Sequence, residues 1–587
     1  MSVSDSSRKI IRRKPASSEA LQGCDIHPVL KRVYANRDIS NPQQINYALD
    51  HLIDYRQLKD IEKAASIVAD SIVNSESIIV VGDFDADGAT SSALVVKALR
   101  SFGLVTATYL VPNRFEYGYG LTPEIVSVAS KDNPDLIITV DNGISSVDGV
   151  MFARQHNIRV VITDHHLPGS ELPDADAIVN PNQLGCSFPG KSTAGVGVAF
   201  YLMLAVRARL REIDWFNEKR PEPNMASLLD LVALGTVADV VPLDDNNRVL
   251  VAQGLQRIRK GHCSEGIKAL LRVAGKDYRN CTSQDFGFAV GPRLNAAGRL
   301  DDMSAGIECL LTDDSDKANE YATLLDDLNR KRKQIETDML SQAMTEVEAQ
   351  LRVMQGLPLE AGICLYNPLW HQGVVGLLAS RIKESFHRPV IAFADAGDAS
   401  SDVEGTIKGS ARSIFGLHIR DVLDAIATKH PRLIIKFGGH AMAAGLSLNK
   451  DKFDDFSRVF VEEVTKRLSE SDLEKTIETD GALASDEMTL ESAEVLRYAG
   501  PWGQHFPEPV FDDVFDVLNW SIVGGKHLKF QLHHKISGCK VNAIAFNKGE
   551  ESLPDGSQTI RAAYRMDVNE FRGSRSLQLI VEHIEPA

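Results

Sequence analysis

The sequence lacks the features of membrane proteins and of disulfide-rich proteins. No apolar run approaches the ~20 residues that span a bilayer, so no membrane segment is expected. Cysteine is scarce, with seven in 587 residues and no pair spaced as CxxC, which argues against a disulfide framework or a zinc site. The basic residues near the start are not followed by an apolar segment, so we expect no secretory signal. These absences favour a cytoplasmic protein.

Negative charge is absent from one long segment of an otherwise acidic chain. The net charge of −16 would disfavour binding to nucleic acid if it were spread evenly over the surface. Binding depends, however, on where the charges lie. Residues 517–549 contain no Asp or Glu, but five lysines and three histidines. Trp520 and Phe530 lie among them. The segment is therefore either a basic groove for nucleic acid, with rings on which bases stack, or a solvated sheet face whose aromatic residues belong to the core.

A chain of 587 residues is long enough for about four domains of ~150 residues. Apolar strands alternate with helical stretches in two regions, which predicts α/β domains with parallel strands. Apolar residues from Tyr321 to Leu351 recur every three or four positions and predict one long helix. Short strand-like runs near the C-terminus predict a small β-barrel or a sandwich. The expected parts are a basic, loosely structured segment 1–45, an α/β domain 46–312, a connecting helix 313–356, a second α/β domain 357–465 and a β-rich domain 466–587.

Acidic and imidazole side chains follow three apolar strands of the first α/β domain. The strands are expected at 78–82, 136–140 and 159–163. The residues that follow them are Asp83, Asp85 and Asp87, then Asp141, and then Asp164, His165 and His166; Asp239 follows a later helix-like run. Ligands of open α/β sheets bind outside the carboxyl ends of the strands. All of these side chains can therefore converge on one crevice.

Converging carboxylates repel one another unless a cation lies among them. The donors are hard oxygens with some imidazole and no thiolate, which favours Mn²⁺ or Mg²⁺. They exceed what one ion takes, so two ions ~3.5–4 Å apart are expected, an arrangement that hydrolyses phosphodiesters. Taken singly, the first acidic motif could be a calcium-type loop, the Asp-His-His motif a helix cap beside surface histidines, and the Asp-Asn-Gly motif a turn. Together they favour the metal site.

The motifs "DFDADG", "VDNG", "TDHH" and "ALGTVADVVPL", in this order, resemble those of the DHH phosphoesterase superfamily. "KFGGHAMAAG" resembles the GGH signature of the associated DHHA1 domain. Over roughly residues 50–587 the chain is similar to the bacterial members of this superfamily that are single-strand-specific 5′→3′ DNA exonucleases. The resemblance implies an OB-like nucleic-acid-binding barrel in the β-rich region.

The resemblance also implies roles for individual residues. Asp85, Asp87, Asp141, His165 and Asp239 match metal ligands. The catalytic set is completed by His166, which faces the scissile phosphate, by Asp164, which orients an imidazole, and by Asp83, which ligates a metal or supports a ligand. The candidates for holding DNA phosphates are Arg114 (for the 5′-phosphate), Arg293, Arg299, Ser410, Arg412, Gly438, Gly439 and His440. Any single arginine among them could instead form a surface salt bridge.

The implied function is metal-dependent hydrolysis of single-stranded DNA, 5′→3′, to mononucleotides in DNA repair and recombination. A monomer that works with single-strand-binding protein and a helicase is implied by the resemblance alone. Three alternatives stay open. The chain could be another phosphodiesterase of the superfamily, acting on oligoribonucleotides, cyclic dinucleotides or pyrophosphate. It could also be a non-catalytic scaffold like the degenerate member in the eukaryotic replicative helicase, or a sensor of metal or nucleotide without turnover.

Overall fold

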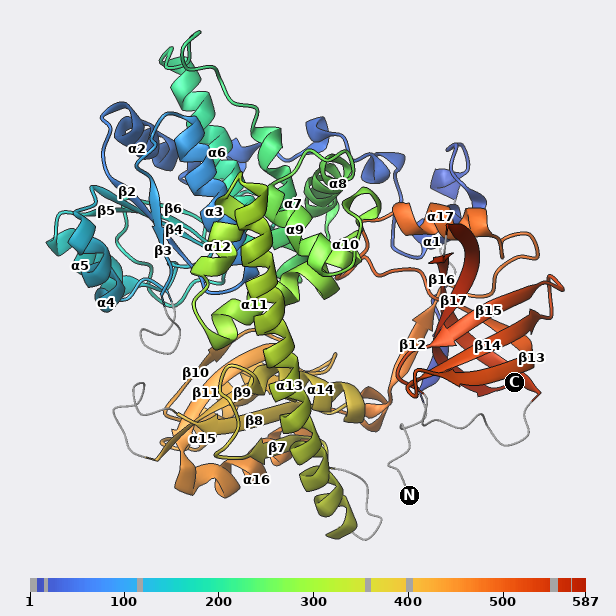
Figure 1. Cartoon of the computed structure of the whole chain (residues 1–587). Helices are drawn as coiled ribbons and strands as arrows, with labels where there is room; N and C mark the ends of the chain where they lie inside the picture. The colour runs from blue at the N-terminus through green and yellow to red at the C-terminus, as the bar shows by residue number, and fades with distance from the viewer. Residues whose placement is uncertain are drawn as a thin grey trace. The chain divides into compact units, whose positions relative to one another are not determined.

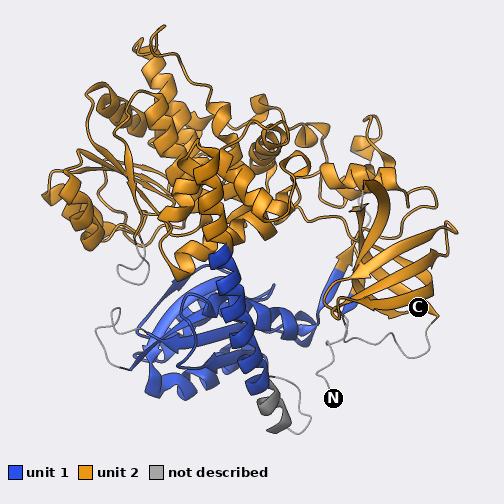
Figure 2. Cartoon of the chain, in the orientation of Figure 1, with its two compact units in different colours: residues 1–9, 327–477 blue, residues 10–326, 478–587 orange. Residues whose placement is uncertain are grey.

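The computed structural model shows a mixed α/β protein with a C-terminal barrel (Figure 1). It describes residues 8–14, 19–112, 120–353, 360–396, 405–548, 558–571 and 573–587. The chain divides into two units (Figure 2): Met1–Lys9 with Asp327–Ile477, and Ile10–Asp326 with Glu478–Ala587. None of the described helices combines the length and apolar character that a transmembrane span requires.

A five-stranded parallel sheet forms the centre of the first α/β domain. Its order is β3 (Thr108–Leu110), β2 (Ile78–Gly82), β4 (Leu136–Val140), β5 (Arg159–Thr163) and β6 (Ala177–Val179). Every residue of β2 and β4 is buried, as expected of parallel strands covered on both faces. Gly82 pairs with Val140, and Val140 pairs with Thr163. Three strands therefore end at one level, which places the residues after them side by side.

Helices cover both faces of this sheet (Figure 1). On one face, α4 (Pro123–Ala129) and α5 (Val147–Gln155) share a buried apolar cluster with the strands. The other face carries α2 (Ile61–Val73), α3 (Ala86–Ser101) and α6 (Gly195–Glu212). The chain continues through α7 (Leu229–Ala238), α8 (Asp245–Arg259), α9 (Glu265–Val273), α10 (Ser283–Asp285), a π-helix (Phe286–Val290), α11 (Gly291–Leu300) and α12 (Ser304–Leu311).

Helix α13 (Ser315–Val353) is 39 residues long and contains the boundary between the two units. In the first half of α13, the buried apolar residues differ from those that the periodicity predicted. Ala322 and Leu325 are fully buried, whereas Leu324 is 46% exposed. Met339 and Val347 are buried as expected.

The second α/β domain has a mixed sheet. Its order is β10 (Lys436–Gly439), β11 (Ala443–Asn449), β9 (Thr406–Arg412), β8 (Val390–Asp395) and β7 (Ile363–Tyr366). The helices of this domain are α14 (Val375–Phe386), α15 (Ile419–Lys429) and α16 (Phe453–Thr465). Along β9, Ile407 and Ala411 point into the apolar core. Because side chains alternate along a strand, Ser410 and Arg412 share the opposite, partly exposed face.

The C-terminal region is a closed barrel, which decides between the two β architectures expected. Its strands are β13 (Phe511–Val523), β14 (His527–His534), β15 (Lys540–Ala545), β17 (Ser574–Pro586) and β16 (Thr559–Phe571), in that spatial order. Closure removes the unpaired edges that an open sheet of this length would expose. Phe511, Phe515 and Tyr564 are fully buried and fill the interior.

The described part of segment 1–45 is not loosely structured, contrary to expectation. It forms β1 (Lys9–Arg12) and α1 (Pro28–Ala35). Arg37 donates two hydrogen bonds to the carboxylate of Asp480, at 3.0 and 3.1 Å, and both side chains are 1% exposed. The Tyr34 hydroxyl donates to the carbonyl of Ala499 at 2.8 Å. Partners more than 400 residues away in sequence therefore order this segment.

Replacing Arg37 by alanine leaves the buried Asp480 carboxylate without its cation. Removing one partner of a buried pair costs ~3–5 kcal/mol, so the free energy of unfolding should fall by that amount in urea titrations. Lys9→Ala is the control, because the Lys9 and Glu474 side chains are 70% and 60% exposed and such pairs contribute at most ~1 kcal/mol. Equal effects of the two substitutions would contradict this account.

Candidate metal centre

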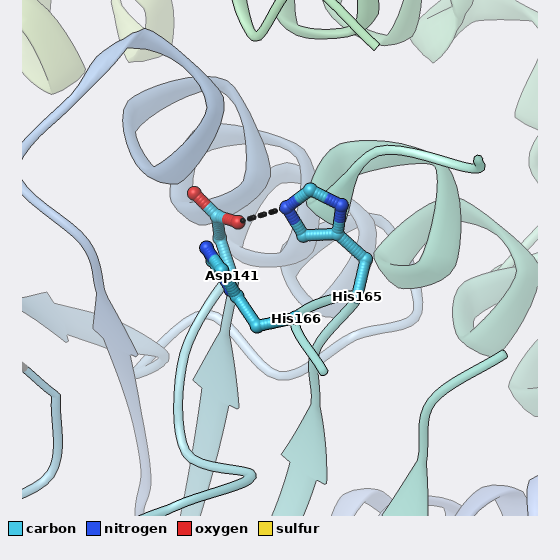
Figure 3. Close-up of side chains that lie close together, drawn as sticks. All are labelled: Asp141, His165 and His166. Carbon is cyan, nitrogen blue, oxygen red and sulfur yellow. Dashed lines mark ion pairs between the residues drawn. The ribbon is translucent and has the colours of Figure 1, made fainter. Parts of the chain in front are cut away.

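The strand ends of the first sheet gather three overlapping groups of acidic and imidazole side chains that could hold metal ions. The groups are Asp83, Asp85 and Asp141; Asp141, His165 and His166; and Asp87, His165 and Asp239. Within each group the candidate ligand atoms lie within 4.8 Å of one another. Nε2 of His165 lies 3.1 Å from Oδ1 of Asp141 (Figure 3) and 3.5 Å from Oδ2 of Asp239. Asp141 and His165 each belong to two groups, which is the connectivity of a centre with two neighbouring ions.

The loop after β2 is held by its own carboxylates. Asp85 is the N-cap of α3, and its Oδ1 accepts from the N–H groups of Asp87 at 2.9 Å and Gly88 at 3.0 Å. Asp87 accepts from the N–H groups of Gly195 and Val196, at 2.7 and 2.9 Å, at the start of α6. A negative charge at the N-terminus of a helix is stabilised by the helix dipole. The carboxylates of this loop therefore join α3 and α6 as well as facing the crevice.

The turn after β4 is held by a backbone conformation and by hydrogen bonds that depend on Asp141 and Asn142. Asp141 has φ of +61° and is 2% exposed. Asn142 Nδ2 donates to the carbonyls of Val81 and Val140, at 3.1 and 2.9 Å, and so ties the ends of β2 and β4 together. A Cβ on Gly195 would lie 2.6 Å from Oδ1 of Asp141. Glycine at this position lets α6 approach the carboxylate closely.

Asp164 orients both histidines of its motif. Its Oδ1 accepts from the N–H groups of His165 and His166 at 2.7 and 3.1 Å, and lies 2.7 Å from Nδ1 of His166. Its Oδ2 accepts from the N–H of Ile144 at 2.9 Å. Burial opposes ionisation of Asp164, but the hydrogen bond with His166 and the histidine charges outweigh it and lower its pKa. Burial also opposes the charged form of His166, yet the hydrogen bond and charge of Asp164 raise the pKa of His166 to about 9.

The electrostatics of the crevice suit divalent cations. Burial is the largest cause that raises the pKa of Asp87, to about 7, and negative neighbours add to it. The same two causes raise the pKa of Asp141 and of Asp239 well above the usual value. Oδ2 of Asp239 is buried, and no described residue donates a hydrogen bond to it. Oxygen and imidazole donors crowded in this way fit Mn²⁺ or Mg²⁺, whose charge removes the repulsion.

Three asparagines that the sequence reasoning missed hold the site in place. Nδ2 of Asn180 donates to the carbonyl of His166 at 2.9 Å, and Nδ2 of Asn182 donates to that of His165 at 2.6 Å. Oδ1 of Asn295, on α11, accepts from the N–H of Ala86 at 2.8 Å. Asn295 lies between Arg293 and Arg299, so the sequence analysis selected this segment for its arginines and not for the asparagine.

The candidate phosphate ligands occupy different environments. Arg114 lies outside the described residues. Arg293 pairs with Asp326 at 2.8 Å and donates to the carbonyl of Ala289 at 2.7 Å, so its guanidinium already has partners. Arg299 lies on α11 and is partly buried. A role in DNA binding stays a prediction for all three arginines.

The other phosphate candidates lie together on the sheet of the second α/β domain. Nη1 of Arg412 donates to Oγ of Ser410 at 3.1 Å, and burial lowers the pKa of Arg412. Gly439 has φ of +142°, and the N–H of His440 donates to the carbonyl of Ala443 at 2.8 Å in the hairpin from β10 to β11. The sheet register aligns Gly438 with Gly445 and Gly445 with Ser410. Gly438, Gly445 and Ser410 therefore share one glycine-rich face with Arg412, whereas Gly439 aligns with Ala444 on the core side of the sheet. A role of the candidates in DNA binding stays a prediction.

The two aromatic candidates of the barrel differ in their exposure, and stacking stays a prediction for Trp520. Phe530 is 1% exposed, so the expectation that it stacks on a base is wrong. Its ring belongs to the barrel core, because alternation along β14 turns this side chain inward. Trp520 is 46% exposed on β13, where a base could reach it.

The fold and the carboxylate-rich strand ends define the DHH class of α/β proteins. Residues 77–236 match the DHH family, N-terminal domain; residues 361–466 match the DHHA1 domain; and residues 479–583 match the RecJ OB domain. The single-stranded-DNA-specific exonuclease RecJ of Dickeya dadantii is 54% identical over 98% of this chain and 99% of its own length. That of Escherichia coli is 53% identical over the same shares. This chain belongs to the RecJ family.

A solved structure extends the similarity. RecJ of Thermus thermophilus, in complex with Mn²⁺, is 27% identical with a TM-score of 0.79, over 99% of this chain and 80% of that one. The agreement in fold covers both α/β domains and the barrel.

Isothermal titration of metal-free protein with Mn²⁺ tests the overlap of the groups. Wild type should bind two ions, because two of the three groups share Asp141 and two share His165. Asp141→Ala should weaken both binding events, whereas Asp239→Ala should leave one. Asp244→Ala is the control, because this residue caps α8 and belongs to none of the groups. Two unchanged binding events in Asp141→Ala would contradict the arrangement.

Proposed function

We propose that this chain is a metal-dependent exonuclease that hydrolyses single-stranded DNA from the 5′ end and releases mononucleotides. The observation that carries the proposal is the register of β2, β4 and β5, which brings Asp83, Asp141 and Asp164 to one edge of the sheet. Membership of a family whose relatives are named single-stranded-DNA-specific exonucleases supports the substrate. A non-catalytic role is disfavoured, because the motifs of this chain keep an acidic residue at every acidic position.

The site contains the groups that phosphodiester hydrolysis needs. Two divalent ions, Mn²⁺ or Mg²⁺, would be held by Asp85, Asp87, Asp141, His165 and Asp239. When bound, they supply positive charge against the phosphate and lower the pKa of water. Because Nδ1 of His166 is engaged with Asp164, its Nε2 is the atom that can donate to a phosphate oxygen. Asp164 stabilises the imidazolium that makes this donation possible.

The 5′→3′ polarity would come from a pocket for the terminal 5′-phosphate, for which Arg114 is the candidate. The second α/β domain would hold another phosphate of the strand. Arg412 and Ser410 present a guanidinium and a hydroxyl on one face, and an arginine fork suits the two oxygens of a phosphate. Gly438 leaves open space above the same face, so a DNA backbone can approach closely. The exposed Trp520 would stack on a base further along the strand.

The setting of the activity is also part of the proposal. We infer a cytoplasmic enzyme of DNA repair and recombination. Duplex DNA would have to be unwound by a helicase first, and the strand would be offered by single-strand-binding protein. We also infer a monomer, which the family resemblance implies.

The activity should depend on His166 and on divalent ions. End-labelled single-stranded DNA with Mn²⁺ should release 5′-terminal mononucleotides, and EDTA should abolish the release. His166→Ala should lower kcat by ~10²–10³-fold, because one donor to the developing charge is lost. His156→Ala is the control, because this histidine is exposed and, among the described residues, its ring nitrogen contacts the carbonyl of Phe152 on the preceding helix. Release from the 3′ end, or full activity of His166→Ala, would contradict the proposal.

Trp520 should matter for long strands only. Loss of one stacked base costs ~1–3 kcal/mol, so Trp520→Ala should raise KM for a long oligonucleotide by about tenfold and leave kcat unchanged. Hydrolysis of very short oligonucleotides should not change. Ile522→Ala is the control on the same strand, because Ile522 is 51% exposed and offers no ring. Equal effects of the two substitutions would mean that the stacking role is wrong.

A further inference from the structure

A small cavity of 230 Å³ lies away from the metal centre, where two helices end together. One is α8, whose last residue is Arg259, and the other is α17 (Leu490–Tyr498), which has Arg497 in its last turn. The rings of Tyr34, Tyr498 and Trp502 also line the cavity. The guanidinium of Arg259 lies over the ring of Tyr498, 4.9 Å from its centroid. The metal centre and the glycine-rich sheet face contribute none of these residues.

Both guanidiniums lack an anionic partner within the described part of the chain. Nε of Arg259 donates to the carbonyl of Cys281 at 2.7 Å. Nη1 of Arg497 is buried and has no hydrogen-bond acceptor. No Asp or Glu is among the described residues that line the cavity. The neighbouring Asp285 is already engaged by Lys276, at 2.9 Å, and by Thr282.

Two partly buried cations at one cavity oppose each other. Burial is the largest cause that lowers the pKa of Arg259. Cys281, Tyr498 and Asp285 act against burial, and the positive charge of Arg497 adds a smaller lowering effect. The negative ends of α8 and α17 offset part of this repulsion, since cations are stabilised at helix C-termini. No described residue accepts a hydrogen bond from Nη1 of Arg497, and a bound oxyanion would do so against the opposing field of the two helix ends.

We propose that this cavity binds a phosphate group through Arg259 and Arg497. Two guanidinium forks match the several oxygens of one phosphate better than the two of a single carboxylate. The volume is below the ~300–1,000 Å³ of pockets for whole drug-sized ligands, so the phosphate enters and the rest of its carrier stays outside. The carrier is either a free phosphate compound, including the mononucleotides released by the proposed reaction, or the backbone of a DNA strand.

The test uses full-length protein with EDTA and the substitution Arg412→Gln, which removes the arginine of the candidate phosphate site on the second sheet. Isothermal titration with inorganic phosphate should give one binding event per chain. Adding Arg259→Gln and Arg497→Gln should weaken it at least tenfold. Arg272→Gln is the control and should leave phosphate binding unchanged. Arg272 is also a cation in the last turn of a helix, but it is exposed and bonds to Asn319. No phosphate binding, or unchanged binding without Arg259 and Arg497, would overturn the proposal.

Two further titrations distinguish the carriers. If the double substitution weakens binding of a 5′-mononucleotide and leaves the affinity for DNA unchanged, the natural ligand is a free phosphate compound. A weaker affinity for single-stranded DNA, with a salt dependence reduced by about one to two phosphate contacts, identifies the strand. Either result supports the site.

A measurement on the wild-type chain remains decisive even where the double substitution prevents folding. Phenylglyoxal modifies accessible guanidinium groups, and mass spectrometry locates the products. Phosphate should slow the modification of Arg259 and Arg497 at least severalfold and leave Arg272 unaffected. Equal modification with and without phosphate would overturn the proposal.

Discussion

Repulsion among buried carboxylates at one edge of a parallel sheet is the constraint on which the rest of this structure depends. The pairing of Gly82 with Val140, and of Val140 with Thr163, brings three strand ends to the same level. Each end is followed directly by an aspartate. The raised pKa values of Asp141 and Asp239, caused first by burial and then by negative neighbours, express the cost of this arrangement. A pair of divalent cations held by these residues would remove that cost and supply the chemistry of hydrolysis.

The surrounding fold holds the acids in place by hydrogen bonds that need no metal. Backbone N–H groups at the start of α6 hold Asp87, and Asp164 gathers the two histidines. Asn180 and Asn182 hold the carbonyls of the same histidines. Such supporting contacts fix the orientation of ligands before a metal binds. The site is therefore preorganised by parts of the chain far apart in sequence.

Much of this could be predicted from the sequence, because local signals determine it. The strands at 78–82, 136–140 and 159–163 agree with β2, β4 and β5, since each apolar run ends abruptly at an acid. The fold class and the convergence of the candidate metal ligands follow from the same signals. Contacts over long separations could not be predicted. The pairing of Arg37 with Asp480, the asparagine supports and the buried position of Phe530 depend on tertiary packing that no single motif encodes.

Diffraction at the manganese absorption edge, from crystals grown with Mn²⁺, tests the central claim most directly. The account predicts two anomalous peaks in the crevice, both bounded by Asp141 and His165, with Asp239 beside one of them. A map with no peak at these residues would contradict it, because the crowded acids would then coexist without the cations that we hold responsible for the site.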